Sequence, residues 1–93
     1  MAVSILIPTP LRRFVGGTDT VSVEAKNVHE AIAALTMKHP DLKKQLLDDK
    51  GEIRSFVNIF VGEKSARDIS NNYRDIPLQD GDVVMLVPAI AGG

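Results

Sequence analysis

The sequence predicts an α+β fold in which one main helix packs on one face of a sheet. Short segments of β-type residues open and close the chain, and one amphipathic segment lies between them. The order is strand, strand, helix, strand and a last strand, with room for a short edge strand within 64–76. The 93 residues suffice for a single core, so we expect one domain over 1–93.

Two strands are expected near the N-terminus. Residues 2–7 are mostly β-branched or apolar and stop at Pro8, and residues 18–24 alternate between polar and apolar types. The Gly16-Gly17 pair between them is a natural turn, so the two strands should form an antiparallel hairpin. The two arginines within 11–15 predict that this connecting segment is exposed.

The main helix is predicted over 27–39. Asn27 is a favourable N-cap, and Glu30 stands three residues later, as in a capping box. Pro40 should end the helix. The apolar positions follow at i, i+3, i+4 and i+7 and form one stripe that faces the core: Val28, Ala31, Ile32 and Leu35. A shorter helical segment is expected over 41–47, anchored by its leucines.

The second half of the chain predicts two further strands. Residues 56–61 form an apolar, β-branched run, in which Ile59 and Phe60 must point to opposite faces of the sheet. A tight turn at 79–82 leads into residues 83–87, a nearly continuous apolar run typical of a central strand. The last five residues, 89–93, have no structural signal and are expected to form a flexible tail.

The composition restricts the classes of function. Apolar residues make up 44% and charged residues 25%, which is ordinary for a globular domain. Eleven basic and twelve acidic residues give a formal net charge of −1, which argues against nucleic-acid binding. The absence of cysteine excludes a disulfide framework and a catalytic thiol. We see no secretory signal or membrane-spanning run and expect a cytoplasmic protein without a membrane partner.

The side chains offer no catalytic constellation, so we do not expect an enzyme. His29 and His39 are ten residues apart and do not share a metal-binding face. The acidic run 48–52 lacks the alternating carboxylates of a calcium loop and is expected to be a turn. Arg12 and Arg13 could touch a partner, although surface arginines usually have no such role. No metal or cofactor site is predicted on the chain.

The C-terminal Gly92-Gly93 pair is the feature with chemical potential. Glycine has no Cβ, so such a tail can enter a narrow channel and bring its carboxylate to another group. The terminal carboxyl has an ordinary pKa of about 3.5, so it is an anion at neutral pH and can attack an activated phosphate. Adenylation by ATP would convert this carboxylate into an acyl donor.

This ending resembles that of the ubiquitin-like sulfur carriers (the ThiS/MoaD-like family), which serve thiamine, molybdopterin and cysteine biosynthesis. The segment 78–93 contains the Asp-Gly-Asp turn, the last strand and the Gly-Gly end that mark these proteins. Residues 7–12 with the glycine pair that follows, 55–61 and the Pro-Ala-Ile-Ala-Gly-Gly ending are most similar to the carriers of cysteine synthesis. The resemblance implies a β-grasp fold with a mixed sheet of four to five strands.

The resemblance also implies a reaction cycle. An E1-like enzyme would adenylate Gly93 with ATP and magnesium, and a sulfur donor would displace AMP to leave a thiocarboxylate. A pyridoxal-phosphate-dependent synthase would accept the sulfur, and a metalloprotease would release cysteine. These cofactors would belong to the partners, whose active sites the tail would enter through Ala89, Ile90, Ala91 and Gly92. The small subunit of molybdopterin synthase, a thiamine carrier and a protein modifier that forms isopeptide bonds to lysine remain alternatives.

Overall fold

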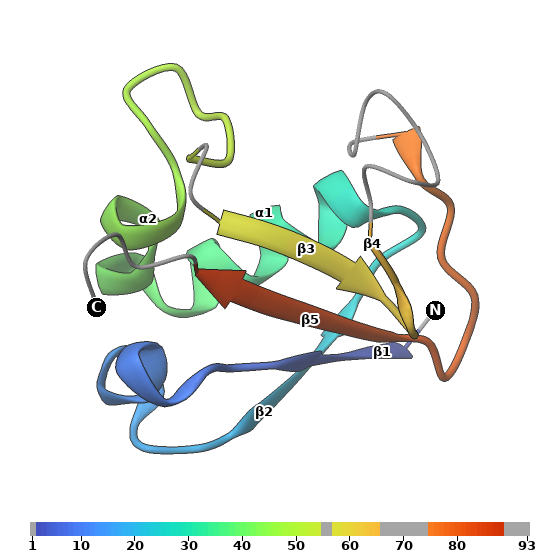
Figure 1. Ribbon diagram of the computed structural model, residues 1–93, viewed down its shortest axis with the longest axis horizontal. Coiled ribbons are helices and arrows are strands. Elements are labelled where there is room, and N and C mark those ends of the chain that lie inside the picture. Colours follow the sequence, from blue (N-terminus) through green and yellow to red (C-terminus); the bar gives the residue numbers. More distant parts are fainter. Residues whose placement is uncertain (1, 55–56, 66–74, 89–93) are drawn as a thin grey trace.

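The computed structural model describes residues 2–54, 57–65 and 75–88. It contains five strands, two α-helices and one 3-10 helix (Figure 1). In chain order these elements are β1 (Ala2–Leu6), η1 (Thr9–Val15), β2 (Thr20–Glu24), α1 (Val28–Lys38), α2 (Pro40–Leu46), β3 (Val57–Val61), β4 (Lys64–Ser65) and β5 (Val83–Pro88). The predicted order of strands and helices is therefore confirmed, and the edge strand is the two-residue β4.

The strands form one mixed sheet in the order β2-β1-β5-β3-β4. Strand β5 lies in the centre, parallel to β1 and antiparallel to β3. Strands β1 and β2 form the expected antiparallel pair, and β4 lies at the opposite edge beside β3. The mixed β-grasp sheet and its central last strand are thus confirmed (Figure 1).

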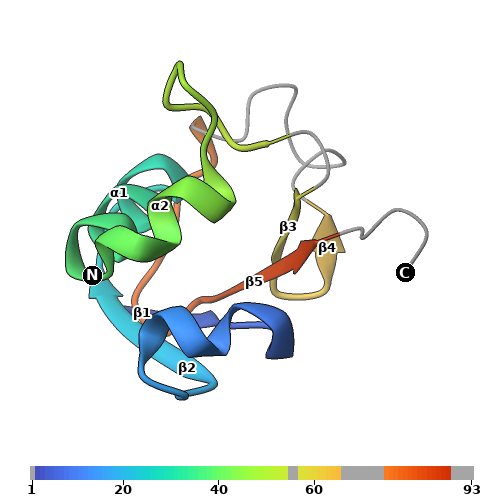
Figure 2. The same cartoon turned by 90° about the vertical axis from the view of Figure 1, so that its left-hand side faces the viewer.

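Local signals at both ends of α1 explain its extent. The Asn27 side-chain oxygen accepts a hydrogen bond from the Glu30 N–H at 2.8 Å, as a capping residue does. The Glu30 carboxylate in turn accepts the N–H of Lys26 at 2.9 Å, one residue earlier than in an ideal capping box. At the other end Pro40 begins α2, which packs against α1. Both helices lie on the same side of the strands (Figure 2).

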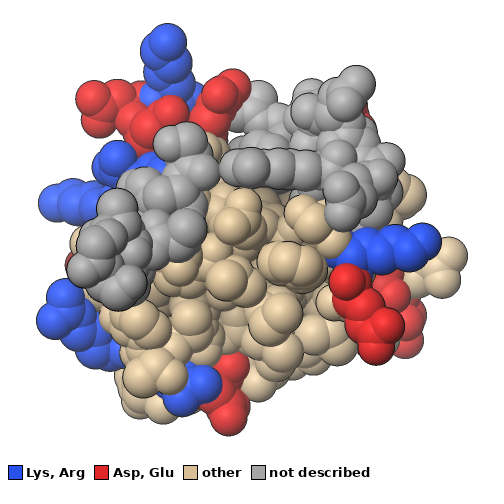
Figure 3. Space-filling model, in the orientation of Figure 1, with Lys and Arg blue, Asp and Glu red and all other residues tan. Residues whose placement is uncertain are grey.

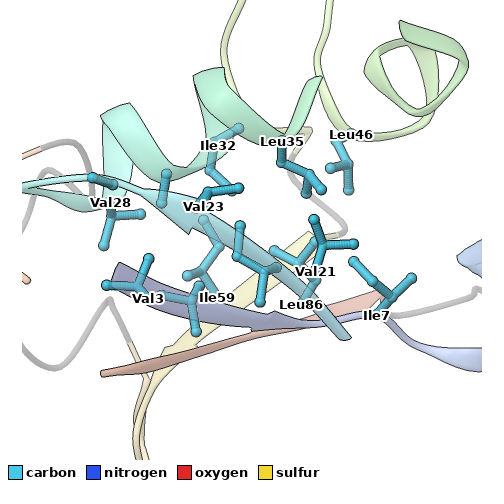
Figure 4. Packing of buried hydrophobic residues seen from close by; sticks show 14 of the residues in the cluster. Val3, Ile7, Val21, Val23, Val28, Ile32, Leu35, Leu46, Ile59 and Leu86 are labelled. Carbon is cyan, nitrogen blue, oxygen red and sulfur yellow. The ribbon is translucent and has the colours of Figure 1, made fainter. Parts of the chain in front are cut away.

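The core lies between this helical layer and the inner face of the sheet. Side chains from α1 and α2 point toward strand residues such as Val3, Ile59 and Leu86 (Figure 4). Leu35 is 0% exposed, and Ile59 is 4% exposed, so the predicted helix stripe and one face of β3 are buried as expected. The core is aliphatic. Because side chains alternate along a strand, the aromatic Phe60 lies on the outer face of β3, opposite to Ile59.

The connection between β1 and β2 differs from the sequence-based expectation of an exposed segment. It forms η1, in which Leu11 and Val15 are buried and Arg12 is half-buried, whereas Arg13 is exposed. The prediction was wrong for the two apolar residues because their burial comes from packing against distant elements, including α2. Strand β5 also extends one residue beyond the predicted run 83–87, to Pro88, which pairs with Val57.

Candidate functional site

The predicted site residues Ala89, Ile90, Ala91, Gly92 and Gly93 lie outside the described residues. The structure nevertheless defines the point from which they start. Pro88 is the last residue of the central strand and is held in the β3–β5 ladder opposite Val57. The last five residues therefore follow directly from a strand that is paired on both sides along part of its length.

The Asp-Gly-Asp turn holds the beginning of this strand. The Asp82 carboxylate accepts the N–H of Gln79 at 2.8 Å, and Gly81 adopts a φ of +88°, which favours glycine. The Asp80 carboxylate accepts the N–H of Ala2 at 2.9 Å, while the Gly81 N–H donates to the Ala2 carbonyl at 2.8 Å. The turn is thereby joined to the first residue of β1, which sets β5 in register beside it.

The outer face of the sheet is apolar at its centre. Met85 of β5 is flanked in register by Leu6 of β1 and Phe60 of β3, and Val83 and Val87 lie on the same side of β5. Leu6 is 36% and Val83 is 37% exposed, and the other three side chains are half-buried. We call these five residues the apolar sheet face. Lys, Arg, Asp and Glu lie around the margin of this side of the molecule, and its centre carries no charge (Figure 3).

An exposed apolar patch bounded by charges is typical of a protein-binding surface. The sequence had left open whether Ile59 or Phe60 would be exposed beside the tail. In the structure Ile59 points into the core, and Phe60 is half-buried on the outer face of the sheet. The patch runs along β5 toward Pro88, so a protein that binds it would also lie close to the start of the tail.

The remaining candidate side chains do not come together. His29 is exposed on α1, and His39 is the C-cap of that helix. Among residues 2–54, 57–65 and 75–88, no group of three or more His, Asp or Glu side chains could hold a metal ion. In the same ranges no helix is long and apolar enough to cross a membrane.

The acidic turn is structural, as predicted. The Asp48 carboxylate accepts backbone N–H groups of Glu52 and Lys50 at 3.0 Å and 2.9 Å. The hydrogen bond from Glu52 has the largest effect and lowers the pKa of Asp48 below its ordinary value. Desolvation opposes this lowering, and the hydrogen bond from Lys50 and the charges of Arg54 and Lys50 add to it. The Asp48 carboxylate thus closes this loop through two backbone hydrogen bonds.

Comparison with known proteins identifies the family. The model of the ThiS family matches residues 5–93. The chain belongs to the ThiS family. It is 33% identical to the sulfur carrier protein CysO of Mycobacterium tuberculosis over the full length of both chains.

Solved structures agree with this assignment. The crystal structure of the Amycolatopsis orientalis BexX/CysO complex contains a chain that matches with a TM-score of 0.85 and 31% identity, over 98% of this chain and 99% of that one. The small archaeal modifier SAMP1 of Haloferax volcanii matches with a TM-score of 0.84 over both whole chains, at 24% identity. The latter likeness concerns the fold alone. The predicted family and the β-grasp fold are both confirmed.

Proposed function

We propose that this ThiS-family chain is a sulfur-carrier protein, a substrate of partner enzymes, whose reactive group is the Gly93 carboxylate. In the first step a carboxylate oxygen attacks the α-phosphorus of ATP on an E1-like enzyme, and pyrophosphate leaves. A sulfur donor then attacks the acyl carbon, AMP leaves, and a thiocarboxylate remains. The observation that carries the proposal is the match along 5–93 to the ThiS family, together with a Gly-Gly end that starts from the central strand.

The proposed destination of the sulfur is cysteine. The full-length similarity to proteins named sulfur carrier protein CysO supports this branch over the thiamine and molybdopterin branches. A pyridoxal-phosphate synthase would then bind an aminoacrylate whose β-carbon the thiocarboxylate sulfur attacks. This attack would give a thioester, whose acyl carbon the cysteine amine would attack, so that an amide forms and the thiol is released. A metalloprotease would then hydrolyse this amide, release cysteine and regenerate the Gly93 carboxylate. ATP, magnesium, pyridoxal phosphate and the protease metal would all be held by these partners.

The apolar sheet face is the proposed docking surface for these partners. It lies beside the root of the tail, and it offers an uncharged centre that a partner can cover. A partner bound here would have the start of the tail at the edge of its interface.

Intact-mass spectrometry of the protein purified from its native host tests the proposal. A species heavier by the difference between sulfur and oxygen, localised to Gly93, is the expected result. A species that carries one additional cysteine residue would support the cysteine branch directly. A chain that is found unmodified when free, and otherwise joined through Gly93 to lysines of other proteins, would contradict the carrier function and favour the modifier.

A further inference from the structure

The two edges of the sheet are protected against further strand pairing to different degrees. At one edge, β4 has only two residues and begins with Lys64, and short strands and lysines are features that discourage pairing. At the other edge lies β2, whose five residues are in unbroken register with β1 (Figure 1). Strand β2 contains no proline and no bulge, and its one charged residue is Glu24 at its end. It therefore presents an edge that can accept another strand.

The main-chain groups of β2 alternate between β1 and the free edge. The Ile7 N–H donates to the Asp19 carbonyl at 2.8 Å, so the main-chain groups of Asp19 and of every second residue after it face β1. The N–H and C=O groups of Ser22, which lies between two such residues, then point away from β1. The Thr20 carbonyl on the same side accepts the Thr18 hydroxyl at 3.2 Å. The middle of the edge thus offers a partner strand both a donor and an acceptor at Ser22.

The side chains of β2 suit pairing with a second, antiparallel β2. A two-fold axis through Ser22, the central residue, pairs all five residues of each strand, whereas a shifted register leaves part of each strand unpaired. Thr20 then lies opposite the partner's Glu24, so no like charges face each other on the exposed side. Val21 lies opposite the partner's Val23 on the buried side, which keeps apolar residues together.

On this basis we propose that two copies of this chain associate through β2 and form one continuous sheet with five strands from each copy. The partner is a second copy because the pattern of β2 is its own complement about Ser22. The central serines exchange their N–H···O=C hydrogen bonds, as in a hydrogen-bonded antiparallel pair. The contact uses neither β5 nor the apolar sheet face, because β1 separates β2 from the central strand. The association does not depend on the sulfur chemistry proposed above.

Sedimentation velocity of the full-length protein tests this association. A single strand pair makes a small interface, so the wild type should shift from monomer toward dimer between about 5 µM and about 500 µM. Ser22→Pro removes the outward N–H and should raise the dimer dissociation constant at least about tenfold. Pairing with β1 is kept, because an edge strand tolerates proline where its N–H faces solvent. Ser22→Thr is the matched control, since it keeps the N–H, suits a strand and should dimerise like the wild type.

A second pair of variants tests the register. Thr20→Glu places an acid opposite the partner's Glu24 and should raise the dissociation constant about fivefold. Adding Glu24→Thr to this variant removes the repulsion and should restore the wild-type value. Melting temperatures establish that each variant is folded, and this pair keeps the test valid if Ser22→Pro unfolds.

Three results would overturn the inference. The first is a wild type that remains monomeric at the highest concentration. The second is a dimer whose dissociation constant is unchanged in the folded Ser22→Pro and Thr20→Glu variants. The third is a double variant that dimerises no better than Thr20→Glu alone, which would exclude the pairing of Thr20 with Glu24.

Discussion

Leu35 and Met37 lie two residues apart in α1 and have opposite surroundings. Leu35 is 0% exposed in the core, and Met37 is 82% exposed. Replacement of Leu35 by alanine should lower the free energy of unfolding by about 2–5 kcal/mol, because it leaves a cavity between the helix and the sheet. Met37→Ala should change it by no more than about 0.5 kcal/mol. Urea denaturation of both variants checks this, and a cost near zero for Leu35→Ala would refute the burial of this helix face.

Asp48 predicts a dependence of stability on pH. Its pKa is lowered in the folded chain by the Glu52 and Lys50 N–H groups, so its ionised form stabilises the fold. That contribution is present above the pKa of the unfolded chain, about 3.9, and is lost as the pH falls through the lower folded value. Asp48→Asn should therefore have a lower free energy of unfolding than the wild type at pH 7. This difference between the two proteins, called the stability gap below, should become smaller below about pH 4.

Urea denaturation at pH 7 and at pH 2.5 measures this gap. The control is Asp49→Asn. Asp49 is exposed in the same turn, and no hydrogen bond joins it to the described residues. A gap between wild type and Asp48→Asn that is equally large at both pH values would contradict the role of the Asp48 carboxylate.

At the scale of the element, β5 has a structural role, and the residues that follow it carry the proposed reactive group. The strand is fixed by pairing with β1 and β3, whereas the reactive group of the proposed cycle is five residues beyond Pro88. Deletion of Gly93 should abolish sulfur loading and leave the melting temperature nearly unchanged. Mass spectrometry after incubation with the activating enzyme and a calorimetric scan measure the two effects. A large fall in melting temperature would show that the terminal residue is structural.

Gly92 should be sensitive to side-chain size. A bulky residue such as leucine at position 92 should block adenylation, because a Cβ and its substituents hinder passage through a narrow channel. Ala91→Ser is a suitable control, since it changes the neighbouring residue with little change in size. Normal pyrophosphate exchange by the leucine variant would refute the channel hypothesis.

In the whole molecule, the inner and the outer face of the sheet have different roles. The inner face is covered by α1 and α2, and the outer one presents the apolar sheet face. Met85→Glu places a charge at the centre of the outer face and should raise KM for the activating enzyme by at least about tenfold. Met37→Glu introduces the same change on the helical side and should leave KM unchanged. Equal effects of the two substitutions on KM would argue against docking through the sheet, provided that both variants remain folded.

Much of this architecture follows from local signals that the sequence states directly. Asn27, Pro40 and the apolar stripe delimit α1, and the Asp-Gly-Asp turn indicates the start of β5, because capping, proline geometry and positive φ depend on neighbouring residues alone. The potential reactivity of the Gly93 carboxylate likewise requires only its place at the end of a Gly-Gly pair. These predictions needed no knowledge of which strands are neighbours.

Tertiary structure decided what depends on contacts between distant segments. Arg12 and Arg13 are equivalent in the sequence, yet the Nε–H of Arg12 donates to the Ile7 carbonyl, whereas the guanidinium of Arg13 lies over the Phe14 ring. The burial of Leu11 in η1 and the half-buried place of Phe60 on the outer face could not be predicted either, since both are set by packing between distant segments. The sequence by itself thus determined the elements and the chemistry of the chain end. The fold determined which surface surrounds that end, because hydrogen bonds and apolar burial between remote residues select one strand order.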